Sequence, residues 1–319
     1  THSIGIKPLR DAVVNHYKKK YGVDISSDQV IVTMGTSPAL LMTLCAIINP
    51  EDEVILSDPT YACYPNFITY IDGKPISVPV YEEDGFIFHP ENIKKKISGK
   101  TKAIIINSPS NPTGCVLPKE IIGEIAELGP CIISDEIYHG LVYGEKEHSI
   151  LEFTDNAFVL NGFSKYYAMT GWRLGYIISP KQFVRPIQKS QQNLFISPNS
   201  ISQWAGVTAL NQEHPEIAKS VETYNERRIF LISRLREIGF RIPHEPRGAF
   251  YILADAKKFS NDSYKFAFDI LENTHVAVTP GIDFGNNAEG FIRFSYANSL
   301  ENIVKACDRL ESFLKDYSR

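Results

Sequence analysis

The stretch Ala157-Phe-Val-Leu-Asn-Gly-Phe-Ser-Lys165 carries a lysine just past a short apolar run. The run at residues 157–160 does not alternate between apolar and polar residues, which is typical of a strand buried on both faces of a sheet. Lys165 lies beside the hydroxyl of Ser164, and Arg173 follows eight residues later. Desolvation at a strand end lets a lysine lose its proton and form a Schiff base, and an arginine fork suits a phosphate. A lone lysine would simply be a solvated surface group, so the remaining motifs decide the interpretation.

Four other apolar runs have the same character: residues 30–33, 53–57, 103–107 and 131–134. Such runs of Val and Ile, alternating with helical patterns, predict an α/β protein with a mostly parallel sheet covered by helices. Open sheets of this kind bind ligands beyond the carboxyl ends of their strands. We therefore expect the functional residues in the loops that begin at Gly35, Asp58, Ser108, Asp135 and Asn161.

The pattern changes in the last third of the chain. A long polar helix is predicted over residues 221–238, with short strands near 250–253, 276–278 and 291–295. A closing amphipathic helix over residues 300–317 follows. We therefore expect a large domain at residues 1–221 and a smaller C-terminal α+β domain at residues 222–319.

Composition excludes several classes of function. The chain has 319 residues and a hydrophobic fraction of 43%. Its net charge of −4 gives no positive electrostatic field that would favour binding to nucleic acid. The longest apolar run, Ala39 to Ile48, is too short to span a membrane. No secretion leader opens the chain, and the five cysteines form no Cys-x-x-Cys pair, which favours the cytoplasm. The histidines lack His-x-x-x-His spacing, so no metal site is predicted.

The loop Gly35-Thr36-Ser37-Pro38 joins the first apolar run to an apolar helix. Hydroxyl residues followed by proline mark the start of a helix. Free backbone N–H groups and the helix dipole at such a start favour an anion. Taken alone, a well-capped helix with no ligand explains this loop equally well.

Four further motifs carry chemically suggestive residues. Asp135 begins Asp-Glu-Ile-Tyr138, Asn111 lies in Asn-Pro-Thr-Gly114, Tyr61 ends Asp58-Pro-Thr-Tyr, and Arg293 lies in Ile292-Arg-Phe-Ser-Tyr-Ala297. Each has a plain structural explanation when taken singly: a helix cap, a turn, aromatic packing and a solvent-facing strand residue. The Asn-Pro-Thr-Gly motif becomes specific through its place, one strand before Asp-Glu-Ile-Tyr138 and two strands before Ser-Lys165.

Together these motifs resemble the pyridoxal-phosphate-dependent aminotransferases of class I/II, the aspartate aminotransferase fold (fold type I). In that family a Ser-Lys pair is followed by Gly-Trp-Arg-Leu-Gly, as at residues 164–175 here. The resemblance covers essentially the whole chain. It implies a mostly parallel seven-stranded sheet sandwiched by helices, a smaller C-terminal α+β domain, and a homodimer. It also implies that an N-terminal family segment, which would precede Gly5, is absent from this chain.

The resemblance implies roles for the residues that act on the cofactor ring. Lys165 would bind pyridoxal 5'-phosphate covalently and then act as general base and acid. Asp135 would keep the pyridine nitrogen protonated, and Tyr61 would stack on the ring. Tyr138 and Asn111 would donate hydrogen bonds to its phenolate oxygen.

The resemblance also implies how the phosphate and the substrate are held. Gly35, Thr36, Ser37, Ser164 and Arg173 would bind the phosphate. Arg293 would bind the α-carboxylate of the substrate, with Asn111 and Asn193 nearby. No arginine occurs near Asn193, so specificity for dicarboxylates by that route is not predicted.

The reaction implied is transfer of an amino group between an L-amino acid and a 2-oxo acid, with an aspartate, aromatic or neutral donor all open. A pyridoxal-phosphate-dependent C–S β-lyase on the same scaffold is the nearest alternative. A non-catalytic cofactor-binding domain of a regulator is another, although no helix-turn-helix segment is evident. A nicotinamide dehydrogenase is disfavoured because no Gly-x-Gly-x-x-Gly follows a strand.

Overall fold

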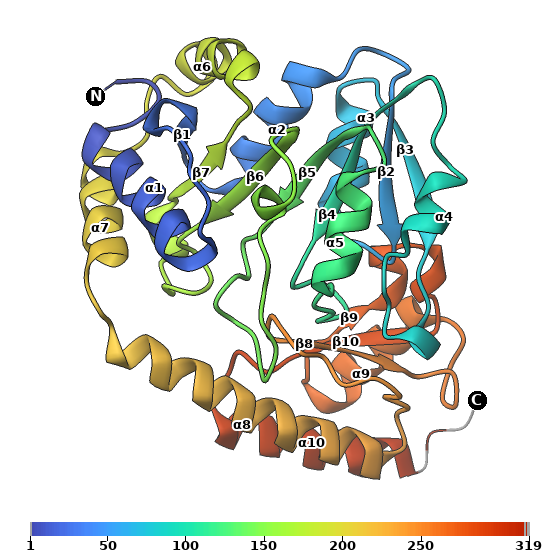
Figure 1. Ribbon diagram of the computed structural model, residues 1–319. Helices are drawn as coiled ribbons and strands as arrows, with labels where there is room; N and C mark the ends of the chain where they lie inside the picture. Colours follow the sequence, from blue (N-terminus) through green and yellow to red (C-terminus); the bar gives the residue numbers. More distant parts are fainter. Residues whose placement is uncertain (1, 316, 318–319) are drawn as a thin grey trace.

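A seven-stranded sheet forms the centre of the larger part of the computed structural model, which describes residues 2–315 and residue 317 (Figure 1). The strand order is β1-β7-β6-β5-β4-β2-β3. All neighbours pair in parallel except β7, which runs antiparallel to both β1 and β6. The strands are β1 (Val30–Thr33), β2 (Glu53–Asp58), β3 (Lys74–Pro79), β4 (Thr101–Asn107), β5 (Cys131–Asp135), β6 (Ala157–Gly162) and β7 (Gly175–Ile178). This confirms the mostly parallel seven-stranded sheet.

Helices cover both faces of this sheet, because alternate strand residues are apolar on both sides. On one face, Ile132 of β5 belongs to a core with residues of α1 (Lys7–Tyr21), α4 (Pro90–Lys94), α5 (Lys119–Ala126) and α7 (Ser200–Asn211). On the other face, Ile133 packs with residues of α2 (Thr36–Ile47), α3 (Cys63–Tyr70) and α6 (Lys181–Leu194). The strand β5 is therefore buried on both sides, as its unbroken apolar sequence predicts.

The five apolar runs predicted as strands are all strands. Two strands, β3 and β7, had no such run. β3 is an edge strand with two prolines, and its side chains are exposed or half-exposed except that of Val78. Edge strands are where prolines are tolerated in a sheet. β7 begins at the last glycine of the Gly-Trp-Arg-Leu-Gly motif and adds only Tyr176, Ile177 and Ile178, so its sequence does not stand out as a separate run.

The small sheet lies beneath the lower edge of the large sheet in Figure 1. It has three antiparallel strands in the order β8-β10-β9: β8 (Tyr251–Asp255), β9 (Thr279–Pro280) and β10 (Phe291–Ser295). Three helices share its core: α8 (Pro215–Ile238), α9 (Ser263–Thr274) and α10 (Leu300–Lys315). Figure 1 shows α8 and α10 running side by side along this end of the molecule.

The strand predicted at residues 276–278 is wrong. The chain leaves α9 through His275 in the left-handed conformation (φ 57°), and the N–H of Val276 donates to Thr274 Oγ1. Pairing with β10 therefore begins only at Thr279, and Pro280 has no N–H to extend it. The valines of this segment pack on the small-domain core instead.

The helix α8 starts earlier than predicted, with Pro215 in its first turn, and ends at Gly239 in the left-handed conformation. Both residues are typical of those helix ends. The proposed division between residues 221 and 222 lies inside this continuous helix. None of the helices in the described part of the chain is long and apolar enough to cross a bilayer.

Candidate active site

Lys165 lies in the loop after β6, with its Nζ 5.8 Å from the ring centre of Tyr138 and 5.6 Å from that of Phe250. Burial lowers the pKa of the Lys165 ammonium, the Asp135 carboxylate opposes this shift, and Arg293 and Arg173 add to it. The amine is therefore easier to deprotonate than a surface lysine. Lys165 also lines a cavity of about 460 Å³ whose other lining residues are not among the predicted site residues.

Asp135 is the last residue of β5 and is buried. Its carboxylate accepts hydrogen bonds from Tyr64 Oη (2.7 Å) and from the N–H of Ile137 (3.1 Å). Burial raises the pKa of Asp135 to about 6, although both hydrogen bonds and Lys165 work to lower it. Asp135 is thus a buried acid whose pKa lies closer to neutrality than that of an exposed aspartate, which is characteristic of functional carboxylates.

Tyr138 faces the site from the loop after β5. Its hydroxyl donates to Tyr251 Oη of β8 at 3.3 Å, and the two rings meet edge to face at 6.0 Å. Phe250 packs against the same ring at 5.5 Å. The small domain therefore helps to hold Tyr138 in place.

Arg293 joins the two domains at the site. Its guanidinium donates from Nη1 to Asn111 Oδ1 (2.7 Å) and from Nη2 to Thr279 Oγ1 (3.1 Å). The charge lies over the rings of Tyr251 (4.2 Å) and Phe284 (4.7 Å). Burial lowers the pKa of Arg293, yet no carboxylate among the described residues forms an ion pair with it within 4 Å. A half-buried guanidinium held by neutral groups is suited to an anionic ligand.

The start of α2 lies against the guanidinium of Arg173. Gly35 precedes the helix at φ 92°, and a Cβ added there would lie 2.8 Å from Arg173 Nη2. Arg173 is itself in the left-handed conformation (φ 49°), with Nη1 donating to Thr170 O at 3.1 Å. Thr36 and Ser37 lie in the first turn, where no side chain caps the free N–H groups. These donors fit the phosphate of pyridoxal 5'-phosphate.

Ser164 and Tyr61 lie in the loops after β6 and β2. Ser164 O accepts a hydrogen bond from Thr170 Oγ1 at 2.9 Å, in the loop that also carries Arg173. Tyr61 is half-buried after β2, and its ring meets that of Tyr64 edge to face at 5.3 Å. Its neighbour Thr60 donates its N–H to Phe284 O, which ties this loop to the small domain.

The structure brings the predicted residues together with the exception of Asn193. Asn193 is exposed on α6, and its Nδ2 donates to Lys189 O of the same helix at 2.8 Å. None of the hydrogen bonds among the described residues links it to the other predicted site residues. Its role stays a prediction.

Three contributors were not predicted as site residues. Tyr64 donates to Asp135, Tyr251 meets both Tyr138 and Arg293, and Thr279 holds Arg293. Tyr64 lies three residues after Tyr61, in the first turn of α3, and its N–H donates to Tyr61 O at 3.0 Å. Tyr251 and Thr279 depend on how the small sheet pairs, which no local motif records.

The sequence model "Aminotransferase class I and II" matches residues 1–310. The chain belongs to this family. It is 43% identical to the (5-formylfuran-3-yl)methyl phosphate transaminase of Methanocaldococcus jannaschii, over 98% of this chain and 83% of that protein. It is 37% identical to an aspartate aminotransferase of Pyrococcus horikoshii, over 99% of this chain and 83% of that protein.

Solved structures of the family agree with the fold. A mutant form of Thermus thermophilus aspartate aminotransferase matches with a TM-score of 0.94 at 35% identity, covering 98% of this chain and 87% of that chain. The family, the fold and the transaminase class are therefore confirmed. The β-lyase and regulator alternatives are not favoured.

Proposed function

We propose that this aminotransferase uses pyridoxal 5'-phosphate at the carboxyl edge of the large sheet, and that the residues predicted from the sequence hold it there. One observation carries the proposal: the desolvated Lys165 amine shares its electrostatic surroundings with Asp135, Arg173 and Arg293. An amine, a carboxylic acid and two guanidinium groups are what this reaction needs in one place.

When bound, pyridoxal 5'-phosphate supplies an aldehyde that condenses with amines and a ring that withdraws electrons from the substrate Cα. Asp135 would accept a hydrogen bond from the protonated ring nitrogen. With its pKa near 6, it is mostly ionised at neutral pH, and a positive ring beside it favours the ionised form further. Tyr64 and the N–H of Ile137 keep this carboxylate fixed in direction.

The remaining cofactor contacts come from separate loops. Gly35, Thr36, Ser37, Ser164 and Arg173 would surround the phosphate. Tyr138 and Asn111 would donate to the phenolate oxygen, and Tyr61 would stack on the ring. Because these residues come from different strand ends, the sheet itself fixes the spacing between the phosphate and the ring nitrogen.

Arg293 would bind the α-carboxylate of the amino acid. The rings of Tyr251 and Phe284 hold its planar guanidinium in place. Asn111 Oδ1 already accepts one of its hydrogen bonds, which indicates a direction in which an anionic oxygen can bind. Lys165, once free of the cofactor, would remove the proton from the substrate Cα and deliver it to the cofactor carbon that carried the aldehyde. Its lowered pKa leaves the neutral amine more abundant for this step.

The substrate class is left open by the relatives, whose names specify aspartate in one case and a furan phosphate in another. An absorption experiment tests the function and the substrate together. Protein mixed with pyridoxal 5'-phosphate receives single amino acids without an oxo acid. We expect one class of amino acid to convert the cofactor to its amine form, which a later addition of 2-oxo acid reverses. Ammonia release with no such conversion would contradict amino transfer.

Homodimer formation is part of the proposal, and exposed apolar side chains support it. Ser202 of α7 donates to Trp172 O at 2.9 Å, which places Trp172 beside that helix. Five large apolar residues here are 45% to 77% exposed: Trp172, Leu194, Ile196, Ile201 and Trp204. Apolar surface of this kind is typical of an association site. Analytical ultracentrifugation should give a dimer that Ile196→Asp weakens, and a monomeric wild type would contradict this.

A cytoplasmic location is also part of the proposal. All five cysteines are free thiols, including the buried Cys115 and Cys307. Free thiols are what reducing compartments maintain.

A further inference from the structure

Glu136 follows Asp135 directly and is a second buried carboxylate, 1% exposed. Its N–H donates to Leu160 O at 2.8 Å, which continues the pairing with β6. Successive side chains of a strand point to opposite faces. Asp135 accordingly meets Tyr64 of α3 on one face, and Glu136 meets Tyr17 of α1 on the other.

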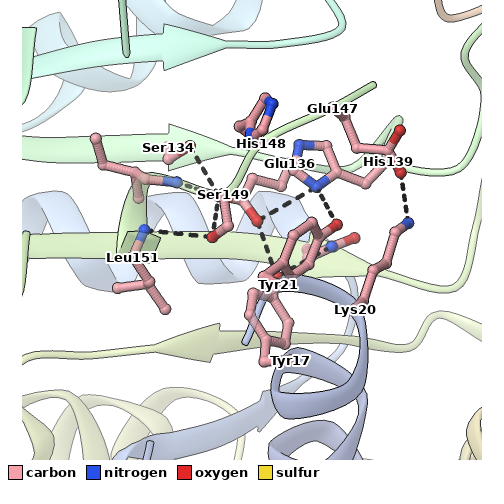
Figure 2. Close-up of polar contacts among 12 residues, drawn as sticks. Tyr17, Lys20, Tyr21, Ser134, Glu136, His139, Glu147, His148, Ser149 and Leu151 are labelled. Carbon is pink, nitrogen blue, oxygen red and sulfur yellow. Dashed lines mark hydrogen bonds and ion pairs between the residues drawn. The ribbon is translucent and has the colours of Figure 1, made fainter. Parts of the chain in front are cut away.

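The Glu136 carboxylate collects donors from three parts of the chain (Figure 2). Its Oε1 accepts from Ser134 Oγ (3.2 Å), Ser149 Oγ (2.9 Å) and the N–H of Ile150 (3.1 Å). Its Oε2 accepts from Tyr17 Oη at 2.9 Å. The strand end, the loop near residue 150 and α1 are thus joined at one side chain.

The same helix also reaches the loop that carries Lys165. Tyr17 Oη accepts a hydrogen bond from Asn161 Nδ2 at 3.3 Å, and Asn161 is the penultimate residue of β6. Further along α1, Tyr21 Oη and His139 Nδ1 lie 2.6 Å apart. The strand end before Tyr138 and the strand end before Lys165 therefore share one anchor, and Glu136 is its centre.

Stability alone does not account for a carboxylate in this place. Burial raises the pKa of Glu136 to about 7 even though four hydrogen bonds lower it. A well-packed apolar side chain would avoid that desolvation and is often no less stable. What an apolar side chain cannot do is hold several donors in fixed directions.

We propose that Glu136 is a positioning residue: its buried carboxylate fixes the end of β5 against α1, so that Asp135 and Tyr138 face the cofactor. This inference rests on the proposed cofactor site. Glu136 lies on the opposite face of the strand from Asp135, and it acts only through the backbone that they share.

The test compares Glu136→Gln with Glu147→Gln. Glu147 is also buried and belongs to the same polar region, where it pairs with Lys20 and accepts from the N–H of Gly140 (Figure 2). It makes no hydrogen bond to β5 among the described residues. For each variant we would measure the melting temperature without cofactor, the affinity for pyridoxal 5'-phosphate, and the pH midpoint of the bound cofactor's absorption change.

We expect Glu136→Gln to weaken cofactor binding by about tenfold and to move the pH midpoint by about half a unit or more. Glu147→Gln should lower the melting temperature and leave both cofactor measurements unchanged. Tyr17→Phe, which removes a single donor, should move them in the direction of Glu136→Gln by a smaller amount. This variant keeps the test decisive if Glu136→Gln does not fold.

Unchanged affinity and midpoint in Glu136→Gln or, if that variant does not fold, in Tyr17→Phe would overturn the inference while the proposed function stands. Equal losses in Glu136→Gln and Glu147→Gln that follow their melting temperatures would also overturn it, since they would show a purely structural role. A wild-type protein that binds no cofactor would instead overturn the proposed function, and this inference with it.

Discussion

The two halves of the site are built from different kinds of strand. Asn111, Asp135 and Lys165 follow or end the neighbouring parallel strands β4, β5 and β6, whose carboxyl ends meet at one edge. Arg293 instead stands in the middle of β10, between two antiparallel partners. The first three meet through topology, whereas the arginine is placed by the side chains around it.

Under the proposed function, this difference would separate the chemical step from substrate recognition. The parallel edge supplies the amine and the acid, and their pKa values are shifted by burial there. The antiparallel sheet supplies a guanidinium held between rings and two neutral acceptors. Changes at the parallel edge should therefore alter the rate of the chemical step, and changes around Arg293 should alter mainly substrate binding.

The largest effect is expected for Lys165→Ala. The variant loses both the covalent anchor and the proton carrier, so kcat should fall by about 10⁴-fold or more. Steady-state assays with the best amino donor check this. A variant that kept a substantial fraction of the wild-type rate would remove Lys165 from the mechanism.

Asp135→Asn should come next. An amide cannot stabilise the protonated ring, so kcat should fall by about 10² to 10³-fold, the range for loss of one preorganised charge. Cofactor affinity should fall less than kcat, because the phosphate contacts remain. A variant with normal kcat and poor cofactor binding would show that Asp135 only anchors the ring.

Arg293→Lys tests the substrate-binding role expected of the antiparallel sheet. A lysine keeps the charge and loses the planar fork, so kcat/KM should fall about 10 to 100-fold through KM. Cofactor affinity should not change. Equal cofactor affinity with a large fall in kcat would contradict the division between chemistry and recognition.

Outside catalysis, an effect is expected on the stability of the protein without cofactor. The folded-state pKa of Asp135, about 6, lies above its ordinary value of 3.8. Burial thus favours the protonated carboxyl of Asp135 in the folded protein. The stability that comes from this protonation is complete below pH 3.8 and is lost as the pH rises through about 6. The amide that replaces this carboxyl in Asp135→Asn does not titrate.

The difference in unfolding free energy, variant minus wild type, should therefore rise by about 2 to 3 kcal/mol between pH 4 and pH 8. Urea unfolding at the two pH values measures it. The comparison cancels the other titrating groups, since both proteins contain them. If the difference stayed flat or fell, burial would not raise the pKa of Asp135.

The sequence predicts the large-sheet half of the site better than the small-domain half. Asp135 and Lys165 each follow an unbroken apolar run, so one local pattern indicates both the strand and the end at which chemistry occurs. The partners of Arg293 have no such signal. Thr279 reaches it because β9 begins later than the valine pattern suggests, and that start depends on how α9 ends.

Covalent trapping tests the central claim most directly. The protein is mixed with pyridoxal 5'-phosphate and reduced with sodium borohydride, and digested peptides are weighed by mass spectrometry. We expect one pyridoxyl phosphate group per chain, on the peptide that contains Lys165, and none there when an amino donor first converts the cofactor to its amine form. Modification spread over surface lysines, with Lys165 unmodified, would contradict it.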